Sequence, residues 1–322
     1  MSIEATISEF YAVLSTVRTH PYNSRKDVEE NCWYASKLYF SVAAKKDAKA
    51  TTASDKQVIY SSLFKMRTQL EKKFEGIVRE NPEIFWDLIY ERGFFGGSLK
   101  QGLSVRFPLT SCQSTKNCGA FCYAHDGRDK HYHAVLRGVL NQQCANNIDL
   151  LMDNKTRESK AFKKQIERAI KISKKEAALT IEEKNYTRSP RLRFSHVGEM
   201  TKSFNFTNWL ASEVKRLSKD SVNCVIYTRH ENVRYLDNSS IIVNFTVEDE
   251  APLPDLPLGT RIVASAWGGE TIKSAEINFI EHHPILGHMI IPTSEARNIC
   301  PVTLHSSEAR TCDEAFCEKC FV

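Results

Sequence analysis

Residues 191–228, RLRFSHVGEMTKSFNFTNWLASEVKRLSKDSVNCVIYT, decide the fold class of this chain. Two apolar runs typical of buried strands, LRFSHV (192–197) and NCVIYT (223–228), lie on either side of a helical pattern at 205–217. A strand, a helix and a second strand in this order are characteristic of a parallel sheet, because the helix returns the chain to the edge from which it started. The sequence therefore predicts an α/β protein.

The strand pattern extends in both directions from this stretch. SIIVNFTV (240–247) and RIVASAW (261–267) continue the series of strands, and LSVRFPL (103–109) begins it. Helices are predicted at 129–152 and 155–182, after the first strand. An open sheet and a partial barrel both fit this order, and we predict a partial (β/α) barrel-like parallel sheet. In such sheets functional residues gather at the C-terminal ends of the strands.

The chain before residue 93 has a helical pattern instead. Apolar residues recur there every three or four positions in three segments, 3–17, 28–42 and 63–77. Asn81-Pro82-Glu83 predicts an N-cap with proline at the first position of a fourth helix. The small, polar segment AKKDAKATTASDK (44–56) predicts a linker. The predicted domains are a helical N-terminal region at 1–92, an α/β partial-barrel domain at 93–299 and a cysteine-rich metal-binding tail at 300–322.

The composition is that of a soluble globular protein, with 42% hydrophobic and 26% charged residues. No apolar run approaches the roughly 20 residues needed to cross a bilayer, so we expect no membrane partner. The N-terminus lacks the basic and apolar segments of a signal peptide, which predicts a cytoplasmic protein. In a reducing cytoplasm, cysteines serve more often as ligands or nucleophiles than in disulfides.

Seven of the ten cysteines fall into two groups. The first group, Cys112, Cys118 and Cys122, lies in SCQSTKNCGAFCYAHDG (111–127), with five and then three residues between its members. Three thiolates on one loop after a strand suit a [4Fe-4S] cluster whose fourth iron is open to a substrate, a cofactor or a distant ligand. A zinc site and a set of buried thiols are the alternatives.

The second group lies in the tail CPVTLHSSEARTCDEAFCEKCFV (300–322). Its members are Cys300, Cys312, Cys317 and Cys320. Four thiolates are enough for one metal centre, so one or two [4Fe-4S] clusters are predicted for the chain, with zinc as the alternative at the tail. The remaining cysteines sit in apolar helical or strand patterns and are predicted to be core thiols: Cys32, Cys144 and Cys224.

The cysteine motifs and two later segments together resemble the phage gene product 88 family. The shared features are the SC-x5-C-x3-CYAH loop, RFSHVGEM (193–200), VIYTRH (225–230) and the CP…C…C-x2-C tail, all within residues 95–322. Members of that family look like relatives of radical S-adenosylmethionine enzymes, in which three loop cysteines bind a four-iron cluster and the methionine moiety chelates its fourth iron. The resemblance implies an incomplete barrel with a cysteine loop after the first strand, and a host-cell cytoplasm if the chain is viral.

The resemblance also implies a set of site residues. The loop cysteines match the cluster ligands, and Tyr123 matches the aromatic residue beside the last of them. Gly198-Glu199, after the next strand, matches a small-residue turn whose acid helps hold the methionine amino group. Gly268-Gly269-Glu270 is a second candidate for that turn.

Two further residues are candidates for cofactor binding. His196 lies two residues before Gly198, near the end of a strand. Arg229 follows the strand at 223–228, where its guanidinium would suit a carboxylate or phosphate. A structural histidine and a surface arginine are the alternatives. The sequence assigns no catalytic residue, and it contains neither a phosphate-binding loop nor a serine-nucleophile elbow, which argues against hydrolases of those types.

The segment 155–176 is strongly basic, with nine Lys or Arg residues against three Glu. Phe162, Ile166 and Ile170 recur every four residues, which predicts a helix with one buried stripe and a wide basic face. Such a face is either a solvated surface or a binding surface for nucleic acid or another polyanion.

Three functions fit these observations. The first is an iron–sulfur enzyme resembling the radical S-adenosylmethionine class, which would bind that small molecule and act on an unknown substrate. The second is an iron–sulfur protein with structural, redox or sensory clusters and no radical chemistry. The third is a zinc-stabilised module that binds nucleic acid through the basic helix at 155–176.

Overall fold

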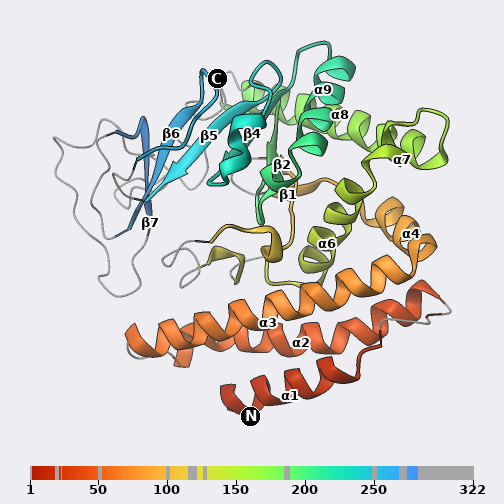
Figure 1. Cartoon of the computed structure of the whole chain (residues 1–322), viewed down its shortest axis with the longest axis vertical. Coiled ribbons are helices and arrows are strands. Elements are labelled where there is room, and N and C mark those ends of the chain that lie inside the picture. The colour runs from red at the N-terminus through yellow and green to blue at the C-terminus, as the bar shows by residue number, and fades with distance from the viewer. Residues whose placement is uncertain are drawn as a thin grey trace. The chain divides into compact units, whose positions relative to one another are not determined.

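The computed structural model describes residues 2–18, 22, 24–49, 53–98, 102–114, 122–125, 129–184, 189–248, 252–267 and 274–281. Within these residues the protein is a mixed α/β structure with a mostly parallel sheet, as predicted (Figure 1). The chain divides into two compact units. The helical unit comprises Met1–Phe94, Arg106–Phe162 and Val197–Glu199, and the sheet unit comprises Phe95–Val105, Lys163–His196 and Met200–Val322.

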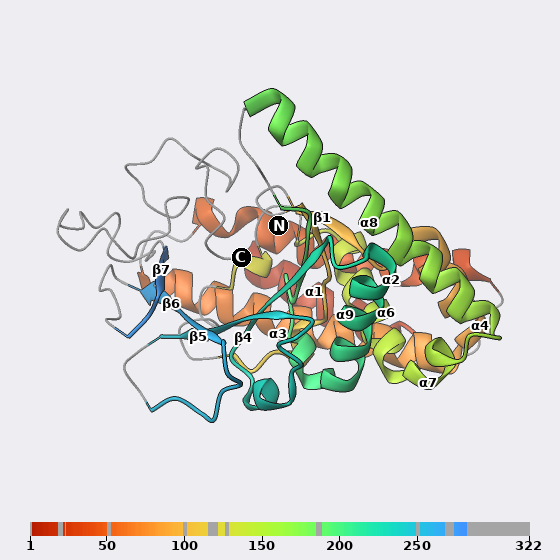
Figure 2. The same ribbon diagram turned by 90° about the horizontal axis from the view of Figure 1, so that it is seen from above.

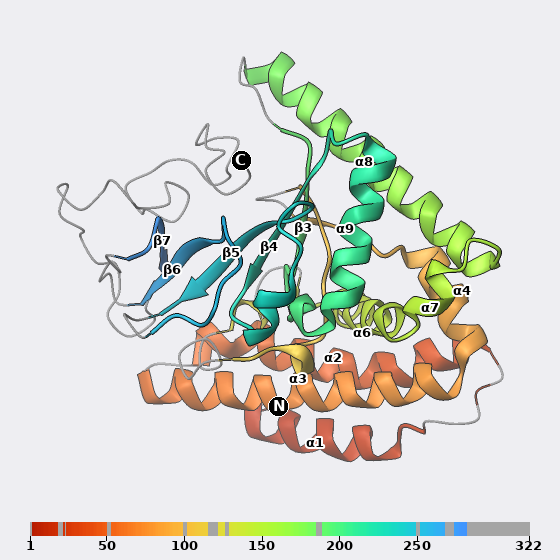
Figure 3. The same cartoon turned by 45° about the horizontal axis from the view of Figure 1, so that its top comes forward.

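The described residues of the helical unit form α-helices and two short 3-10 helices. They are α1 (Ile3–Thr16), α2 (Arg25–Lys49), α3 (Ala53–Glu80), α4 (Pro82–Arg92), η1 (Leu109–Ser111), η2 (Tyr123–His125), α6 (Tyr132–Asn146) and α7 (Ile148–Met152). Helices α1, α2 and α3 lie side by side (Figures 1 and 3). Large side chains from these helices, among them Phe10, Tyr39 and Phe74, are almost completely buried and form the core of this unit.

One local prediction in this region was wrong and another was confirmed. The predicted linker at 44–56 is largely helical, because α2 continues to Lys49 and α3 begins at Ala53. Ala and Lys are strong helix formers, so a small, polar composition does not end a helix. The start of α4 is as predicted, with Asn81 at the N-cap position and Pro82 as the first helical residue. The side chain of Asn81 makes no cap bond to α4, however; its Nδ2 donates instead to the carbonyl of Ile77 at 2.7 Å. Asn81 therefore stabilises the end of α3.

Among its described residues, the sheet unit contains seven strands in the order in which they occur along the chain. They are β1 (Gly96–Ser98), β2 (Gly102–Ser104), β3 (Arg191–Phe194), β4 (Asn223–Thr228), β5 (Ile242–Val247), β6 (Arg261–Trp267) and β7 (Ile277–Glu281). β1 pairs with β2 in antiparallel orientation, and all later neighbours are parallel. β4 and β6 coincide with predicted strands, whereas β1 and β7 were not predicted.

The predicted strand at 103–109 is shorter than expected, since β2 ends at Ser104. The chain remains hydrogen-bonded for one more residue: Val105 N–H donates to the carbonyl of Arg193, and Val105 accepts from His196 N–H, both at 2.8 Å. The end of β2 and the turn after β3 are therefore held together within the sheet unit.

Two helices accompany the sheet. The long helix α8 (Arg157–Lys184) precedes β3, and α9 (Phe204–Ser218) connects β3 to β4 (Figure 2). Ser173 fastens α8 to β3, because its Oγ accepts from Arg191 N–H at 2.6 Å and donates to the Arg191 carbonyl at 2.9 Å. The short helices η3 (Met200–Ser203) and η4 (Glu231–Tyr235) complete the unit. None of the described helices has both the length and the apolar character that a bilayer-spanning segment requires.

Candidate functional site

Two of the three loop cysteines lie among the described residues, and both pack against one apolar cluster in the helical unit. Cys112 directly follows η1, and Cys122 directly precedes η2. Cys122 is buried, whereas Cys112 is partly buried at the margin of the cluster. The other members are Phe64, Leu109, Ala124 and Val197. The two ends of the cysteine loop therefore pack against the same apolar cluster, although ten positions separate them in the sequence.

The segment Val197–Glu199 is hydrogen-bonded to the residues that lead into the loop. Phe107 N–H donates to the carbonyl of Val197 at 2.7 Å. Glu199 N–H donates to Oγ of Ser111, also at 2.7 Å, and Ser111 is the residue before Cys112. The structure thus brings Gly198-Glu199 beside the first cysteine of the loop, and Glu199 is buried there.

Gly198 is required at its position for two reasons. Its φ of +76° lies in the left-handed region, which side chains disfavour. A Cβ atom at this position would also lie 2.4 Å from the carbonyl carbon and oxygen of Phe107. Gly138 on α6 approaches the same peptide, since a Cβ there would lie 3.1 Å from it. The Phe107 peptide is therefore enclosed by two glycines, and any larger residue at 198 would displace it.

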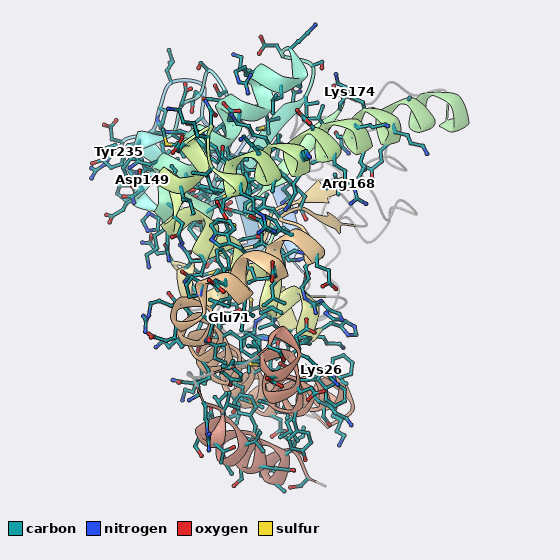
Figure 4. The ribbon with its side chains drawn as sticks, turned by 90° about the vertical axis from the view of Figure 1, so that its right-hand side faces the viewer. Lys26, Glu71, Asp149, Arg168, Lys174 and Tyr235 are labelled. Carbon is teal, nitrogen blue, oxygen red and sulfur yellow. The ribbon has the colours of Figure 1, made fainter. Side chains whose placement is uncertain are left out.

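A buried ion pair on α3 supports both arms of the loop. Arg67 and Glu71 are 1% and 0% exposed, and Nε of Arg67 lies 2.5 Å from Oε1 of Glu71. Glu71 also accepts the Thr110 N–H at 3.2 Å, two residues before Cys112. Arg67 donates from Nη1 to the carbonyl of Asp129 at 2.9 Å, beyond the other end of the loop. Figure 4 shows Glu71 among the helices of this unit.

The residues around Asp129 are themselves fixed by hydrogen bonds. The Asp129 carboxylate accepts from Nε of Arg106 at 2.8 Å, in an ion pair that is largely buried. Nδ2 of Asn141, on α6, donates to the carbonyl of Arg106 at 2.9 Å and to that of Phe94 at 3.0 Å. Asp129 therefore links α3 to the strand-like segment that enters the cysteine loop.

Tyr39 on α2 holds the downstream end of the loop. Its hydroxyl is hydrogen-bonded to Nδ1 of His125 at 2.8 Å, and both side chains are fully buried. The His125 N–H donates to the carbonyl of Cys122 at 3.1 Å, so the second arm turns immediately after the cysteine. The rings of Tyr60 and Phe64 also pack against the His125 ring in T-shaped arrangements. Aromatic packing thus fixes η2 against α2 and α3.

Burial determines the electrostatics of this network. Burial raises the pKa of Tyr39 to about 12, with Arg67 opposing the rise and the negative charges of Glu71 and Cys122 adding to it. Burial alone would lower the pKa of Arg67, but Glu71 and Tyr39 raise it above its ordinary value. Arg67 therefore stays positively charged. It is buried beside the two arms of the cysteine loop, where its charge favours negatively charged groups.

The three described cysteines outside the loop are all buried. Cys32, Cys144 and Cys224 are 2%, 0% and 3% exposed, which confirms that they are core residues. Burial raises the pKa of each of these thiols. Thiolates are the species that bind metals, so protonated core thiols are poor ligands at neutral pH.

Several predicted site residues lie outside the described residues. They are Cys118, the tail cysteines Cys300, Cys312, Cys317 and Cys320, and the acidic turn at 268–270. Within the described part of the chain, no three His, Cys, Asp or Glu side chains form a group that could hold a metal. Cys112 and Cys122 supply two thiols, and the predicted third ligand is Cys118. Tyr123 is the first residue of η2, directly after Cys122.

The remaining candidates, His196 and Arg229, belong to the sheet unit. His196 is partly buried in the turn after β3, where its backbone N–H donates to the carbonyl of Val105. Arg229 follows β4 and forms an ion pair with Glu248, which follows β5. Both side chains of that pair are largely buried, so the guanidinium already has a carboxylate partner. Binding of a cofactor by His196 or Arg229 stays a prediction.

Sequence reasoning missed the residues that support the loop, above all Tyr39, Arg67 and Glu71. One signal was present in the sequence. Arg67 and Glu71 are four residues apart and lie on the same face of the helix as the apolar stripe that includes Leu70 and Phe74. Opposite charges at this spacing within an apolar face indicate a buried ion pair.

The site therefore consists of a cysteine loop held at both ends by α2 and α3, with a glycine-acid turn bonded to its first arm. A comparison of the chain with protein-family models, curated proteins and solved structures found no match. What the site does must follow from its own residues.

Proposed function

We propose that this chain is an iron–sulfur protein in which Cys112, Cys118 and Cys122 hold a [4Fe-4S] cluster with one open iron. The observation that carries the proposal is that Cys112 and Cys122, from the two ends of the loop, pack against a single apolar cluster. Apolar surroundings suit such a cluster, because they exclude water from its sulfur atoms. Three protein thiolates leave the fourth iron available to another ligand.

The order of the strands supports a more specific version of the proposal. Parallel strands that follow one another in space as they do in sequence occur in (β/α) barrels. We therefore propose a partial barrel, with the cysteine loop after its first parallel strand, β2, and Gly198-Glu199 after the next, β3. This is the arrangement that the resemblance to radical S-adenosylmethionine enzymes implies.

In this version Glu199 helps to hold the amino group of S-adenosylmethionine beside the cluster. Two observations support that role: Glu199 is buried, and its backbone is bonded to Ser111, adjacent to Cys112. Gly198 allows the close approach that places it there. A four-iron cluster with an open iron, when bound, supplies one-electron reduction of a ligand at that iron.

The first test is the metal content of the protein purified without oxygen. A brown protein with about eight irons would fit clusters at both cysteine groups, and about four irons would fit one. Cys112→Ala, Cys118→Ala and Cys122→Ala should each remove the irons of the first cluster. Cys144→Ala, at a core thiol, is the matched control and should retain them. A colourless protein with stoichiometric zinc would overturn the proposal and favour the zinc-stabilised module.

The tail cysteines are tested in the same preparation. Cys317→Ala should release the metal of a second centre built from the tail and leave the first cluster intact. Iron or zinc lost in that variant identifies the metal that the tail binds.

A binding measurement separates the two iron–sulfur functions. Protein with its cluster in place should bind S-adenosylmethionine in equilibrium dialysis, and Glu199→Gln should weaken that binding while iron content stays unchanged. Asp220→Gln, an exposed acid of the sheet unit, is the control. No binding by the cluster-loaded protein would leave a structural, redox or sensory cluster as the function.

A further inference from the structure

Helix α8 carries a stripe of exposed cations within the sheet unit. The stripe consists of Lys164, Arg168, Lys171 and Lys175, which are all exposed, and Lys174 lies beside it. With about 100° of rotation per residue, these four residues fall within about 60° of one another around the helix. Figure 4 shows Arg168 and Lys174 on this helix.

The stripe faces away from the sheet unit. The buried residues of the same helix segment are Ile166, Ala169, Ile170, Ser173 and Ala177. Ser173 is bonded to β3, and by the same rotation it lies about 180° from Lys164. The cations therefore project directly into solvent.

The stripe is not neutralised by other described residues. None of its four cations forms an ion pair with a residue in the described part of the chain. Lys163, on the flank of the helix, does find a partner, Glu213 on α9 at 4.0 Å. One acid, Glu167, borders the stripe, and its charge acts on Arg216 of α9.

Like charges one helical turn apart repel each other and weaken a helix. Three successive pairs of this kind occur along the stripe, at spacings of four, three and four residues. A bound polyanion would neutralise these charges and remove the repulsion. Binding of an anionic partner would therefore stabilise the helix.

We propose that this stripe binds the phosphate backbone of nucleic acid without reading its sequence. The four cations extend over about 16 Å, with one cation every 5 Å or so, a linear array that suits a chain of regularly spaced phosphates. No large apolar side chain is exposed on the described part of α8, so the helix lacks the anchor that interfacial membrane helices bury. Backbone binding of this kind contributes affinity and salt dependence rather than sequence specificity.

The test uses the full-length protein and a fluorescein-labelled 20-nucleotide DNA, single-stranded and as a duplex. Fluorescence anisotropy between 50 and 200 mM salt should show affinity that falls steeply with salt. Arg168→Gln/Lys171→Gln/Lys175→Gln should weaken binding at least tenfold and reduce the slope of log K against log salt by about 2–3.

The matched control is Lys65→Gln/Lys72→Gln/Arg79→Gln, which removes the same charge from exposed positions on α3. It should bind DNA nearly as tightly as the unmodified protein. Equal weakening in both variants would mean that net charge, and not the stripe, attracts DNA, which would overturn the proposal. Binding to phosphatidylserine vesicles in the absence of DNA binding would overturn it as well. Iron content should be the same in the unmodified protein and in both triple variants. A negative result for DNA binding would therefore leave the cluster proposal standing, and the loss of the cluster proposal would leave this one standing.

Discussion

Gly198 has a positive φ, which residues with a side chain rarely adopt. The neighbouring Phe107 peptide also leaves no room for a Cβ atom at this position. Gly259 provides a natural comparison, because its φ is +83° but no atom lies within 4 Å of the place where its Cβ would be. Gly198→Ala should lower the free energy of unfolding by about 3 kcal/mol or more, and Gly259→Ala by about 1 kcal/mol. Urea unfolding of the two variants measures the difference.

Both variants place alanine at a positive φ. The difference between their free energies of unfolding therefore measures the cost of the clash with the Phe107 peptide alone. If Gly198→Ala cost no more than Gly259→Ala, the Phe107 peptide would move freely and the turn would not be fixed against the loop. Under our proposal, Gly198→Ala should also lose iron from the first cluster, because the turn and the Ser111 arm would separate.

Tyr39 makes a contribution to the pH dependence of stability that its replacement can isolate. Its folded-state pKa is about 12, against an ordinary value of 10.0, so folding favours the protonated hydroxyl. This contribution is fully present below about pH 10 and is lost as the pH rises through about 12, with a magnitude of roughly 2–3 kcal/mol. Tyr39→Phe should therefore flatten the fall in unfolding free energy over that range. Tyr235→Phe replaces an exposed tyrosine on η4 and serves as the control. Its free energy of unfolding should depend on pH in the same way as that of the unmodified protein.

Among the elements, α3 contributes most to the site, because its ion pair holds both arms of the loop. Removing one member of a buried pair leaves an uncompensated charge, so Arg67→Met or Glu71→Leu should each lower the free energy of unfolding by about 3–5 kcal/mol. Lys26→Met is the control, since the Lys26–Glu30 pair has the same four-residue spacing but is 82% and 64% exposed. It should change the free energy of unfolding by less than about 0.5 kcal/mol. Figure 4 shows Lys26 and Glu71 in the same unit.

The double variant Arg67→Met/Glu71→Leu completes a mutant cycle for this pair. It should be more stable than either single variant, because neither charge is left alone. It should not regain full stability, since the Thr110 N–H and the Asp129 carbonyl would both lose their partners. A double variant whose loss equals the sum of the single losses would show that the two side chains act independently.

The elements differ in how well the sequence predicts them. β4 and β6 could be predicted because buried parallel strands carry continuous apolar runs. β1 has the sequence GGS, without any apolar signal, and exists because it pairs with β2. The place of the cysteine loop after a strand and of Gly198 in a turn after the next strand could be predicted, whereas the roles of these residues in binding a cluster and a cofactor stay predictions. The support from α2 and α3 could not, because it depends on which distant segments pack against those helices.

On the level of the whole molecule, the chain passes back and forth between the two units. The helical unit takes Arg106–Phe162 and Val197–Glu199 in addition to the first helices, so its segments are not contiguous. No linker signal marks these crossings, because each lies inside or next to a regular element; one occurs within α8. The sequence pattern of a chain of this kind therefore does not show by itself how the chain divides into compact units.

This interleaving predicts the behaviour of a fragment of residues 1–92, which contains α1 to α4 alone. Tyr39, Arg67 and Glu71 would lose His125, Asp129 and Thr110, their partners elsewhere in the helical unit. Buried polar groups without partners cost about 1–3 kcal/mol each, a large share of the stability of a small domain. The fragment should therefore show helical circular dichroism but no cooperative thermal transition.

A fragment of residues 1–162 tests whether those missing partners are the reason. It restores all three hydrogen bonds and lacks only Val197–Glu199 from the helical unit, so it should unfold cooperatively, with a lower midpoint than the full chain. A sharp, reversible transition in the shorter fragment would show that α1 to α4 fold without the cysteine loop. In that case the buried ion pair would serve the helices themselves, and the loop would be held chiefly by its own cluster around Cys122 and Val197.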